Sequence, residues 1–441
     1  MFINIAKMDT MYKQFNIDGS TYIFCVEDFE ILKISENGKK ESILQEIKNK
    51  KAKSEKNIDE LQKYESGYAK STNINTIGVN LVNGCNLNCT YCYISASSKK
   101  RENLSERKFI DILNFLKKEK DNPVTFYFAG SGEPTLNFKL MKQLPKLCKE
   151  NGFKKITLDL TTNGTILTKE MIEFLKINKF DINISLDGNE EIHDLSRVYN
   201  NGKGSFKDVY HNITLLQENN IKFLCTTVLV PCNNKIIDVF NFFEEKKIYS
   251  FFAIATNSFD DNYIPSIKCL DNFKNQMNLV VEKYVELIRS NNTIYSLKIK
   301  NDIERIHYGD TKAVACVGAR EGIYIDMDGS IFPCSYHSKS KELSVGDIYV
   351  GIDYDKIIEN KWYAQPVDNY ETCRDCWMKY LCSGSCFAIK WLENNNTETP
   401  SEYLCKTYDI YWSAIIKLYI LIYPDIIEGK NVNFKDINDG K

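Results

Sequence analysis

Short β-rich runs alternate with helical patterns between about residues 75 and 255, and this alternation constrains the fold more than any other feature. The six runs lie at 75–82, 124–128, 155–162, 181–187, 222–230 and 250–255. The intervening stretches predict amphipathic helices at 104–120, 138–151, 168–178, 206–220 and 235–247. Ser105 is suited to cap the first of them. Repeated strand–helix units predict a parallel sheet, either doubly wound or curled into a full or partial barrel. In both arrangements the working residues lie at the carboxyl ends of the strands.

Fifteen cysteines in 441 residues require an explanation. The opening segment MFINIAKMDTMYKQ lacks the apolar core of a secretory signal, so we expect a cytoplasmic protein with metal or redox chemistry and no disulfide framework. The net charge of -2 gives no indication of nucleic-acid binding. The apolar stretch 410–427 is interrupted by Lys417 and Pro424. It therefore predicts an amphipathic helix packed on the protein, with no membrane role.

A first cysteine cluster follows the first predicted strand. The segment GCNLNCTYCY places Cys85, Cys89 and Cys92 in a single loop. Three thiolates are one short of the four that complete a zinc site or a [4Fe–4S] cluster. Such a set predicts either a cubane with one open iron, or a zinc site with a distant fourth ligand.

CNLNCTYC resembles the CX3CXφC motif of the radical S-adenosylmethionine superfamily, with Tyr91 as the aromatic residue. The resemblance implies that Cys85, Cys89 and Cys92 bind a catalytic [4Fe–4S] cluster. Its open iron would chelate the methionine part of S-adenosylmethionine, and an electron from the cluster would split the sulfonium to give a 5′-deoxyadenosyl radical. The cofactor supplies this chemistry, while the protein supplies orientation and a dry pocket.

Two segments at the next strand ends resemble cofactor contacts of the same family. FAGSGEPTLNF, after the second strand, is similar to the glycine-rich segment that holds the methionine amino group, and it carries Gly130, Gly132 and Glu133. Ser131 stands between the glycines, which departs from the family pattern. LTTNGT ends the third strand and places Asn163 where the family often has a polar contact.

The fourth strand ends in ISLDG and is followed by a segment that contains HDLSR. This run resembles a family stretch in which Ser185 and Arg197 would contact the ribose or the carboxylate of the cofactor. A guanidinium suits a carboxylate because its planar fork bonds both oxygens. Asp187 and His193 fit turn and capping roles equally well.

A second group of cysteines lies near the C-terminus, where regular periodicity fades after about residue 311. Its spacing is Cys316-x12-Gly329-x4-Cys334, then Cys373-x2-Cys376-x5-Cys382-x3-Cys386, then Cys405. This pattern resembles the SPASM extension of peptide-modifying radical enzymes; two zinc sites are the alternative. The resemblance implies one complete auxiliary [4Fe–4S] cluster on Cys373, Cys376, Cys382 and Cys405. A second auxiliary cluster would have only Cys316, Cys334 and Cys386.

Some relatives carry a further cysteine six residues after the first of this set, but here that position is Gly322. The resemblance to thioether-forming maturases implies that a substrate thiol takes the open position, which would deprotonate the sulfur and hold it near the reacting carbon. The alternative is that water or one of the unassigned cysteines fills it. Those cysteines are Cys25, Cys148, Cys225, Cys232 and Cys269.

The N-terminal part differs from the rest. Residues 14–26 predict a hairpin around Asp18 and Gly19, with Cys25 as a small core residue, and the lysine- and glutamate-rich segment 36–65 predicts a helix. The arrangement resembles the winged-helix-like module with which ribosomal-peptide maturases pair a strand edge with a leader peptide. A structural cap on the barrel is the alternative.

We therefore expect an α/β protein: a partial (β/α)6 TIM-like barrel with a C-terminal cysteine-rich iron–sulfur (SPASM) domain and a small N-terminal winged-helix-like module. The expected ranges are 1–72 for the leader-recognition-like module, 73–300 for the barrel, 310–406 for the SPASM domain and 407–441 for a helical tail.

The resemblance implies a radical enzyme with three [4Fe–4S] clusters, one catalytic and two auxiliary, and S-adenosylmethionine. Its substrate would be a cysteine-containing ribosomal precursor peptide with a leader, and its product a thioether of the sactipeptide or ranthipeptide type. A flavodoxin or ferredoxin would supply electrons. Alternatives are carbon–carbon crosslinking, epimerisation, oxidation of serine or cysteine, or a non-catalytic electron-transfer protein.

Overall fold

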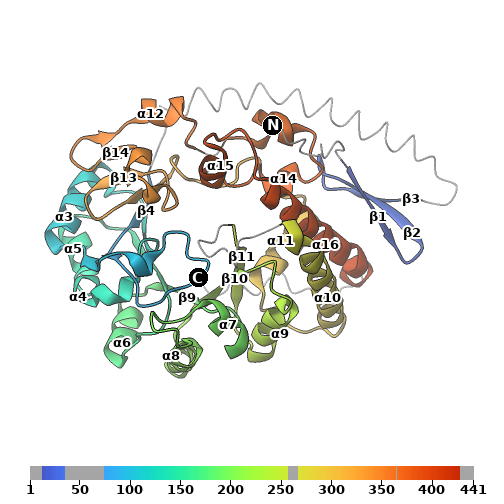
Figure 1. Cartoon of the computed structure of the whole chain (residues 1–441), viewed down its shortest axis with the longest axis horizontal. Coiled ribbons are helices and arrows are strands. Elements are labelled where there is room, and N and C mark those ends of the chain that lie inside the picture. Colours follow the sequence, from blue (N-terminus) through green and yellow to red (C-terminus); the bar gives the residue numbers. More distant parts are fainter. Residues whose placement is uncertain (1–11, 35–73, 257–266, 364, 428–441) are drawn as a thin grey trace.

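The computed structural model describes residues 12–34, 74–256, 267–363 and 365–427 (Figure 1). Its largest sheet has ten strands in the order β11-β10-β9-β8-β7-β4-β12-β13-β14-β15. The predicted helical segment 36–65 and most of the expected N-terminal module lie outside the described residues.

All six predicted strands are present, and neighbours in this part of the sheet pair in parallel. They are β4 (Thr76–Val79), β7 (Val124–Phe128), β8 (Ile156–Thr162), β9 (Asp181–Ser185), β10 (Leu224–Leu229) and β11 (Ser250–Ile254). Figure 1 shows the helices on the outer side of an arc of strands. The α/β class and the curved parallel sheet are therefore confirmed.

The helices between these strands also match the predicted periodicity. They are α3 (Glu106–Phe115), α6 (Lys169–Ile177), α8 (Phe206–Glu218) and α9 (Ile236–Lys246). A further helix, α7 (Glu190–Ser196), was not predicted. Ser105 caps α3 because its side chain accepts a hydrogen bond from the Lys108 amide at 3.2 Å. The prediction of one helix over 138–151 was wrong: α4 (Phe138–Met141) ends before α5 (Leu144–Glu150). Pro145 sits in the first turn of α5, where its missing amide is tolerated, whereas inside one long helix it would break the hydrogen-bond ladder.

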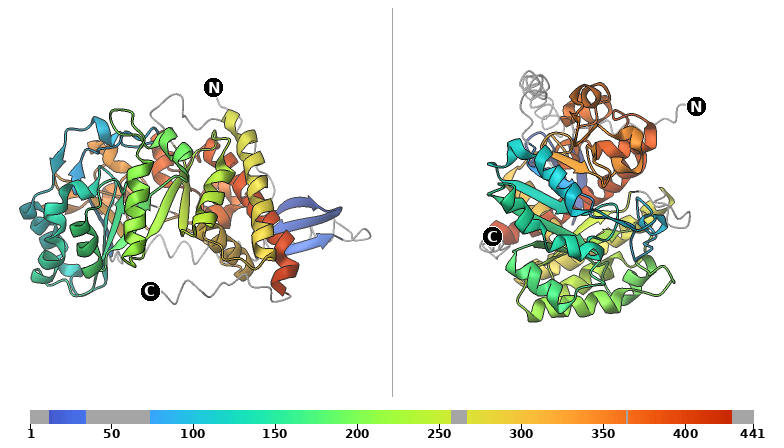
Figure 2. Two further views of the ribbon diagram at one scale, coloured as in Figure 1. Left: turned by 90° about the horizontal axis from the view of Figure 1, so that it is seen from below. Right: turned by 90° about the vertical axis from the view of Figure 1, so that its left-hand side faces the viewer.

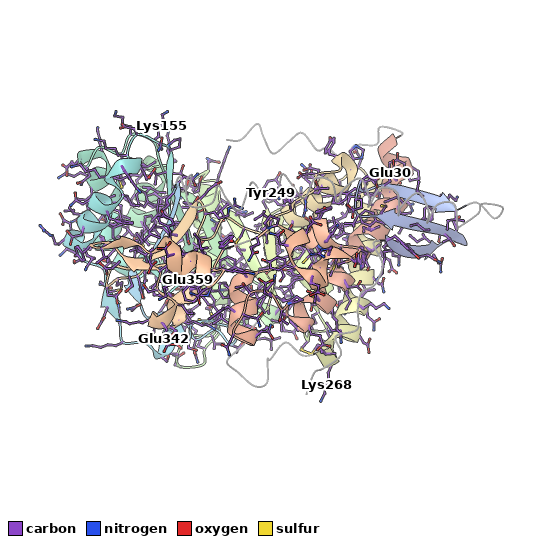
Figure 3. The ribbon with its side chains drawn as sticks, turned by 90° about the horizontal axis from the view of Figure 1, so that it is seen from above. Glu30, Lys155, Tyr249, Lys268, Glu342 and Glu359 are labelled. Atoms are coloured by element: carbon purple, nitrogen blue, oxygen red, sulfur yellow. A yellow bond between two sulfur atoms is a disulfide. The ribbon has the colours of Figure 1, made fainter. Side chains whose placement is uncertain are left out.

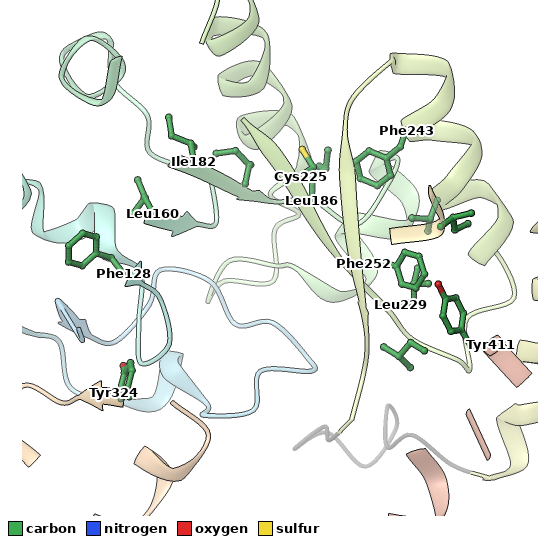
Figure 4. Packing of buried hydrophobic residues seen from close by; sticks show 14 of the residues in the cluster. Phe128, Leu160, Ile182, Leu186, Cys225, Leu229, Phe243, Phe252, Tyr324 and Tyr411 are labelled. Atoms are coloured by element: carbon green, nitrogen blue, oxygen red, sulfur yellow. The ribbon is translucent and has the colours of Figure 1, made fainter. Parts of the chain in front are cut away.

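Alternate side chains along the barrel strands point into the hydrophobic core and away from it. In β7, Val124, Phe126 and Phe128 are buried while the residues between them are less so. The core extends from Phe128 across the sheet to Phe252 and Tyr411 (Figure 4). Closely packed side chains of this kind fix the strands, so residues at the strand ends are held in defined positions.

The C-terminal cysteine region joins the barrel sheet, which the sequence did not predict. Strand β12 (Gly322–Ile325) pairs in parallel with β4, with Ile323 opposite Ile77. The sheet continues in antiparallel fashion through β13 (Ser330–Phe332), β14 (Gly346–Asp347) and β15 (Gly351–Ile352). Because the segments around Cys316 and Cys334 flank β12 and β13, this pairing fixes them beside the first barrel strand.

The rest of the C-terminal region consists of short elements, as expected. They are α11 (Leu297–Tyr308), α12 (Tyr354–Glu359), α13 (Glu371–Arg374), α14 (Lys379–Cys382) and α15 (Phe387–Asn394). The predicted helix over 410–427 forms part of α16 (Glu402–Ile427), which packs against α10 (Leu270–Arg289) and α11 (Figure 2). Within the described residues, no helix is long and apolar enough to cross a membrane.

The N-terminal hairpin is confirmed. Strands β1 (Tyr12–Ile17) and β2 (Ser20–Cys25) join at Asp18 and Gly19, both with positive φ, and β3 (Ile31–Ile34) adds a third strand. Cys25 is fully buried, as expected. In Figure 3, Glu30 marks this end of the molecule and Lys155 the opposite end.

Two ion pairs attach the hairpin to the C-terminal region. Glu27 follows β2 and pairs with Lys379 of α14 at 2.8 Å, where both side chains are almost completely buried. Lys13 of β1 pairs with Asp409 of α16 at 2.8 Å. The small sheet is therefore packed on the part of the chain that carries the second group of cysteines.

Candidate active site

A cavity of about 320 Å³ lies at the carboxyl ends of the parallel strands. Its lining includes Cys85, Cys89, Cys92, Tyr91, Gly130, Gly132, Glu133, Asn163, Ser185 and Arg197. The structure thus brings together all ten residues that the sequence singled out for the first cluster and the cofactor. This volume lies within the range of small-molecule sites, and the strand ends are where such folds place them.

Burial is the main influence on the pKa values of the thiols Cys85 and Cys89. It raises the pKa of Cys85 to about 11, with further contributions from Glu133 and the nearby Cys92. The pKa of Cys89 rises to about 12, mainly through burial and also through the charges of the two neighbouring thiols. Backbone amides face the sulfurs: Leu87 donates to Cys85 Sγ at 3.4 Å and Ala96 to Cys92 Sγ at 3.5 Å.

These thiols fit an iron–sulfur cluster. No group of three or more His, Cys, Asp or Glu side chains in the described ranges is arranged around a single ion position. A cubane does not require that arrangement, because each thiolate binds a different iron. Thiols with such high pKa values are protonated at neutral pH, so iron must displace the proton to bind. Amides that donate to the sulfurs would then compensate the negative charge of the cluster.

Glycine is required where the FAGSGEP segment meets the cysteine loop. A Cβ on Gly132 would lie 2.3 Å from the Val82 carbonyl oxygen and 2.4 Å from that of Gly84. Gly130 has a φ of +114°, which side chains rarely adopt. Ser131 is buried against Tyr324, whose hydroxyl donates to Ser131 Oγ at 3.1 Å, so this departure from the family pattern is accommodated by the C-terminal region.

Glu133 is held rigidly by its own chain. Its Oε1 accepts hydrogen bonds from the Thr135 amide, the Thr135 hydroxyl and the Thr162 hydroxyl at 3.1, 2.7 and 2.6 Å. Its Oε2 accepts from the Asn163 amide at 2.7 Å. Burial nevertheless raises the pKa of the carboxyl group. A buried carboxylate at the cavity wall is suited to a cationic group such as the amino group of methionine.

Asn163 connects the end of β8 to the cysteine loop. Its Nδ2 donates to Asn86 Oδ1 at 2.8 Å and approaches Cys85 Sγ at 3.7 Å. Its Oδ1 accepts from the Thr165 amide and hydroxyl. The side chain therefore orients the loop around Cys85 as well as lining the cavity.

Asp187 holds Arg197 in place. Arg197 Nε donates to Asp187 Oδ2 at 2.8 Å, and the same oxygen accepts from the Tyr91 hydroxyl. The guanidinium carbon lies 5.3 Å from the centroid of the Tyr91 ring. Burial would raise the pKa of Asp187, but Arg197, His193 and the hydrogen bonds from Tyr91 and the Val228 amide together outweigh it, and the pKa falls below its usual value. The sequence did not distinguish this role from that of a turn residue.

His193 is a structural residue. It is fully buried, its Nδ1 accepts from the Asp187 amide at 3.2 Å, and its Nε2 lies 2.9 Å from the Ser205 hydroxyl. Burial lowers the pKa of His193 to about 4, so the ring is neutral at physiological pH. The hydrogen bonds of His193 therefore support a structural role, in which it fixes the turn at Asp187, over contact with the cofactor.

The C-terminal cysteines form two further sets. Burial raises the pKa of Cys334 to about 12, with contributions from Cys386 and Cys316. Burial also raises the pKa of Cys382, together with Cys405, Cys373 and Cys376. The structure therefore brings together the same two groups that the SPASM resemblance implies.

The backbone between Cys382 and Cys386 has an unusual conformation. Ser383, Gly384 and Ser385 all adopt left-handed conformations, with φ values of 58°, 79° and 66°. Such a run is unusual for residues that carry a side chain, and strained backbone of this kind is concentrated at functional sites. The SPASM resemblance assigns Cys382 and Cys386 to different clusters, and a backbone of this shape is compatible with that assignment.

The unassigned cysteines have other environments. Cys232 and Cys269 form a single disulfide, which the sequence did not predict. Cys148 and Cys225 are fully buried in the main hydrophobic core, and Cys25 in a small cluster of the N-terminal sheet. None of these five cysteines is therefore a good candidate for the fourth ligand of the incomplete set. Water remains as the alternative to a substrate thiol at that position.

Two tyrosines of the cavity wall lie near Cys334, and their positions beside cysteines were the only indication of them in the sequence. Tyr93 and Tyr336 both line the cavity, and their rings stack with centroids 4.2 Å apart. The Tyr93 hydroxyl donates to Ser335 at 3.0 Å. Burial raises the pKa of Tyr336 to about 12, with contributions from Cys386, Cys334 and Cys92. Tyr336 is thus close to thiols of both groups.

The curved sheet and the three-cysteine loop at its carboxyl edge define an enzyme that holds a reactive cofactor. Residues 79–243 match the profile of the Radical SAM superfamily, so this part of the chain is a radical SAM domain. Such a domain implies a [4Fe–4S] cluster and S-adenosylmethionine, which the cavity residues fit.

Related proteins extend over most of the chain. A cysteine-type anaerobic sulfatase-maturating enzyme of Clostridium perfringens is 26% identical over 347 residues, covering 74% of this chain and 91% of that protein. The antilisterial bacteriocin subtilosin biosynthesis protein AlbA of Bacillus subtilis is 28% identical over 331 residues, covering 71% of this chain and 67% of AlbA.

Solved structures share the fold. Native anSMEcpe with bound AdoMet superposes with a TM-score of 0.68 at 22% identity, covering 80% of this chain and 99% of that one. Streptococcus suis SuiB bound to the precursor peptide SuiA gives a TM-score of 0.51 at 16% identity, covering 89% and 97%. At these identities the likeness concerns the fold alone.

Proposed function

We propose that this enzyme modifies a cysteine-containing, ribosomally made precursor peptide and forms thioether crosslinks between cysteine sulfur and a substrate carbon. The observation that carries the proposal is the proximity of Tyr336, a residue of the cavity wall, to Cys334 and Cys386, which in turn lie near Cys316. Three thiols leave one ligand position of a cubane for a group from outside the chain.

The catalytic cysteines, the cofactor contacts and the two auxiliary sets are part of this proposal. When bound, the cluster and S-adenosylmethionine supply an electron and the 5′-deoxyadenosyl radical, which removes a hydrogen atom from the substrate. The chain contributes orientation: Glu133 faces the amino group, and Arg197, fixed by Asp187, presents its guanidinium to a carboxylate or ribose. The stacked rings of Tyr93 and Tyr336 would shield the reactive centre from water on their side of the cavity.

The named activities of relatives support a peptide or protein substrate. AlbA is a bacteriocin biosynthesis protein, and the SuiB structure contains a precursor peptide. A flavodoxin or ferredoxin is the proposed reductant, and a leader sequence the proposed recognition element of the substrate. The N-terminal strands β1–β3 are the proposed contact for that leader.

Oxidation of a substrate cysteine is the second candidate, favoured by the similarity to the sulfatase-maturating enzyme over 91% of its length. Gly322 opposes it, because some enzymes of that kind have a fourth cysteine at this position. The two outcomes differ in the product: a thioether consumes the thiol and joins two residues, whereas oxidation yields an aldehyde on a single residue.

Co-expression tests the proposal. The enzyme and the cysteine-rich peptide encoded beside its gene are produced together, and the purified peptide is treated with an alkylating agent and analysed by tandem mass spectrometry. Thioether formation predicts the loss of two hydrogens per crosslink, cysteines that resist alkylation, and missing fragment ions between the joined residues. Unmodified, freely alkylated cysteines would contradict the proposal. A Cys89→Ala enzyme is the control.

A further inference from the structure

Lys390 is a buried cation without a hydrogen-bond partner. Its side chain lies on α15, and the residue has a relative exposure of 0%. Among the described residues, Nζ finds no acceptor, and it lies 3.3 Å from the centroid of the Tyr370 ring. A charge is expensive to bury unless it is paired and hydrogen-bonded, and an aromatic face compensates only part of that cost.

The groups around Lys390 are the auxiliary cysteines. Cys373, Cys382 and Cys405 each act electrostatically on Lys390, and Lys390 in turn acts on Cys386. Glu398 also acts on it, but this carboxylate lies near the surface and pairs with Lys361 at 2.6 Å. The ammonium group therefore faces thiols that are neutral until iron binds.

Lys379, another buried lysine of the same region, shows how the charge of a structural lysine is normally compensated. Lys379 pairs with Glu27 at 2.8 Å and with Asp368 at 2.9 Å. Both are carboxylates of the chain, so its charge is compensated without any cofactor. Lys390 lacks such partners, which indicates that its counter-charge comes from a group that binds next to it.

We propose that Lys390 is the counter-ion of the auxiliary cluster on Cys373, Cys376, Cys382 and Cys405, that Nζ donates hydrogen bonds to this cluster, and that its charge raises the reduction potential. The inference rests on the auxiliary clusters of the proposed function. A four-thiolate [4Fe–4S] cluster is an anion, and one-electron reduction makes it more negative. A cation held beside it in a water-poor interior favours the reduced form.

The test is a potentiometric titration of the full-length, anaerobically reconstituted enzyme, followed by electron paramagnetic resonance. Lys390→Met keeps an unbranched side chain, one atom shorter, and removes the charge, whereas Lys390→Arg keeps the charge. Lys406→Met is the matched control: Lys406 is next to Cys405 in sequence but is partly exposed and paired with Glu402. A Cys373→Ala enzyme identifies the signal of the cluster in question.

Lys390→Met is expected to lower the potential of that signal by about 59 mV or more, which is a tenfold or larger fall in the equilibrium constant for reduction. Lys390→Arg should largely restore it, and Lys406→Met should leave it unchanged. Loss of only this cluster in Lys390→Met, with retention in Lys390→Arg, would also support the proposal. Unchanged potentials with full iron content in Lys390→Met would overturn it.

The experiments distinguish failure of the Lys390 proposal from failure of the proposed function. If the wild-type enzyme binds iron only for the radical cluster, both the auxiliary sets and the role of Lys390 are wrong. If the potential shifts as expected but no peptide is crosslinked, the role of Lys390 stands and the substrate assignment fails.

Discussion

Arg197 donates a hydrogen bond to Asp187 across 2.8 Å in a place where both side chains are buried. The carboxylate also accepts from Tyr91, the aromatic residue between Cys89 and Cys92. One acidic side chain thus joins the loop after β9 to the cysteine loop. Asp187 is a positioning residue, because it acts on the cofactor cavity through Arg197 and Tyr91.

Replacing Asp187 with asparagine should weaken S-adenosylmethionine binding at least tenfold, which corresponds to about 1.4 kcal/mol. The reason is that Arg197 loses its partner and its fixed orientation. Calorimetric titration of the reconstituted enzyme measures the effect, with iron content as a check. Asp187→Asn combined with Arg197→Lys should bind little worse than either single variant, since both act through one interaction. Additive losses would show that Asp187 acts independently of Arg197.

Asp208→Asn is the control for this experiment. Asp208 accepts from the Tyr199 hydroxyl at 2.7 Å and is not among the residues lining the cavity. Cofactor affinity of this variant should equal that of the wild-type enzyme.

Stability should fall in mild acid because of buried histidine. The pKa of His193 is about 4 in the folded chain, below its ordinary value of 6.5. The unfolded chain therefore binds a proton first as the pH falls. This contribution to stability is complete above about pH 6.5 and is lost toward about pH 4, by an amount on the order of 1–3 kcal/mol.

Urea unfolding of the apoprotein at several pH values between about 7.5 and 5 measures this loss. His193→Gln should flatten the dependence without abolishing it, because burial also lowers the pKa of His337, to about 3. An equally steep dependence in the variant would contradict the assignment to His193.

Two cysteines four positions apart should affect different clusters. Cys382→Ala should remove or alter the cluster of the complete set, and Cys386→Ala that of the incomplete set. Mössbauer spectra and iron analysis of each variant measure the result. Cys148→Ala, which changes a core cysteine, should retain all clusters. Identical losses in Cys382→Ala and Cys386→Ala would show that the two thiols serve one cluster.

The sequence allowed much of this arrangement to be predicted, because the strand runs and the cysteine spacing are local patterns. The six barrel strands and the hairpin at Asp18 follow from periodicity and turn chemistry. The pairing of β12 with β4 could not be predicted, since the residues around Ile323 and Ile77 are far apart in the chain and short apolar strands carry no information about their partners.

The less predictable parts of the site depend on long-range contacts. Asp187 and Lys390 look like an ordinary turn residue and an ordinary helix residue in sequence. Their roles follow from what the fold places opposite them: Tyr91 and Arg197 in one case, and thiols in the other. The disulfide between Cys232 and Cys269 likewise depends on a tertiary approach across 37 residues.

Gly322 offers a direct test of the open ligand position. Gly322→Cys should supply the fourth thiolate to the set of Cys316 and abolish crosslinking, while cleavage of S-adenosylmethionine continues. The site accepts a side chain with little adjustment, since a Cβ would lie 3.3 Å from Val317 and the backbone is not left-handed. Peptide mass spectrometry and 5′-deoxyadenosine analysis measure the two activities.

Gly322→Ala is the matched control and should crosslink the peptide nearly as well as the wild type. Undiminished crosslinking by Gly322→Cys, with all clusters present, would show that no substrate ligand is needed at this position.

The central claim is that the loop of Cys85, Cys89 and Cys92 directs radical cleavage of S-adenosylmethionine in the cavity beside it. The most direct measurement is chromatographic quantification of 5′-deoxyadenosine after the reconstituted enzyme is reduced with dithionite and supplied with S-adenosylmethionine. We predict that the wild-type enzyme forms 5′-deoxyadenosine and that Cys89→Ala forms none. Absence of this product from wild-type enzyme with a complete, reduced cluster would contradict the account.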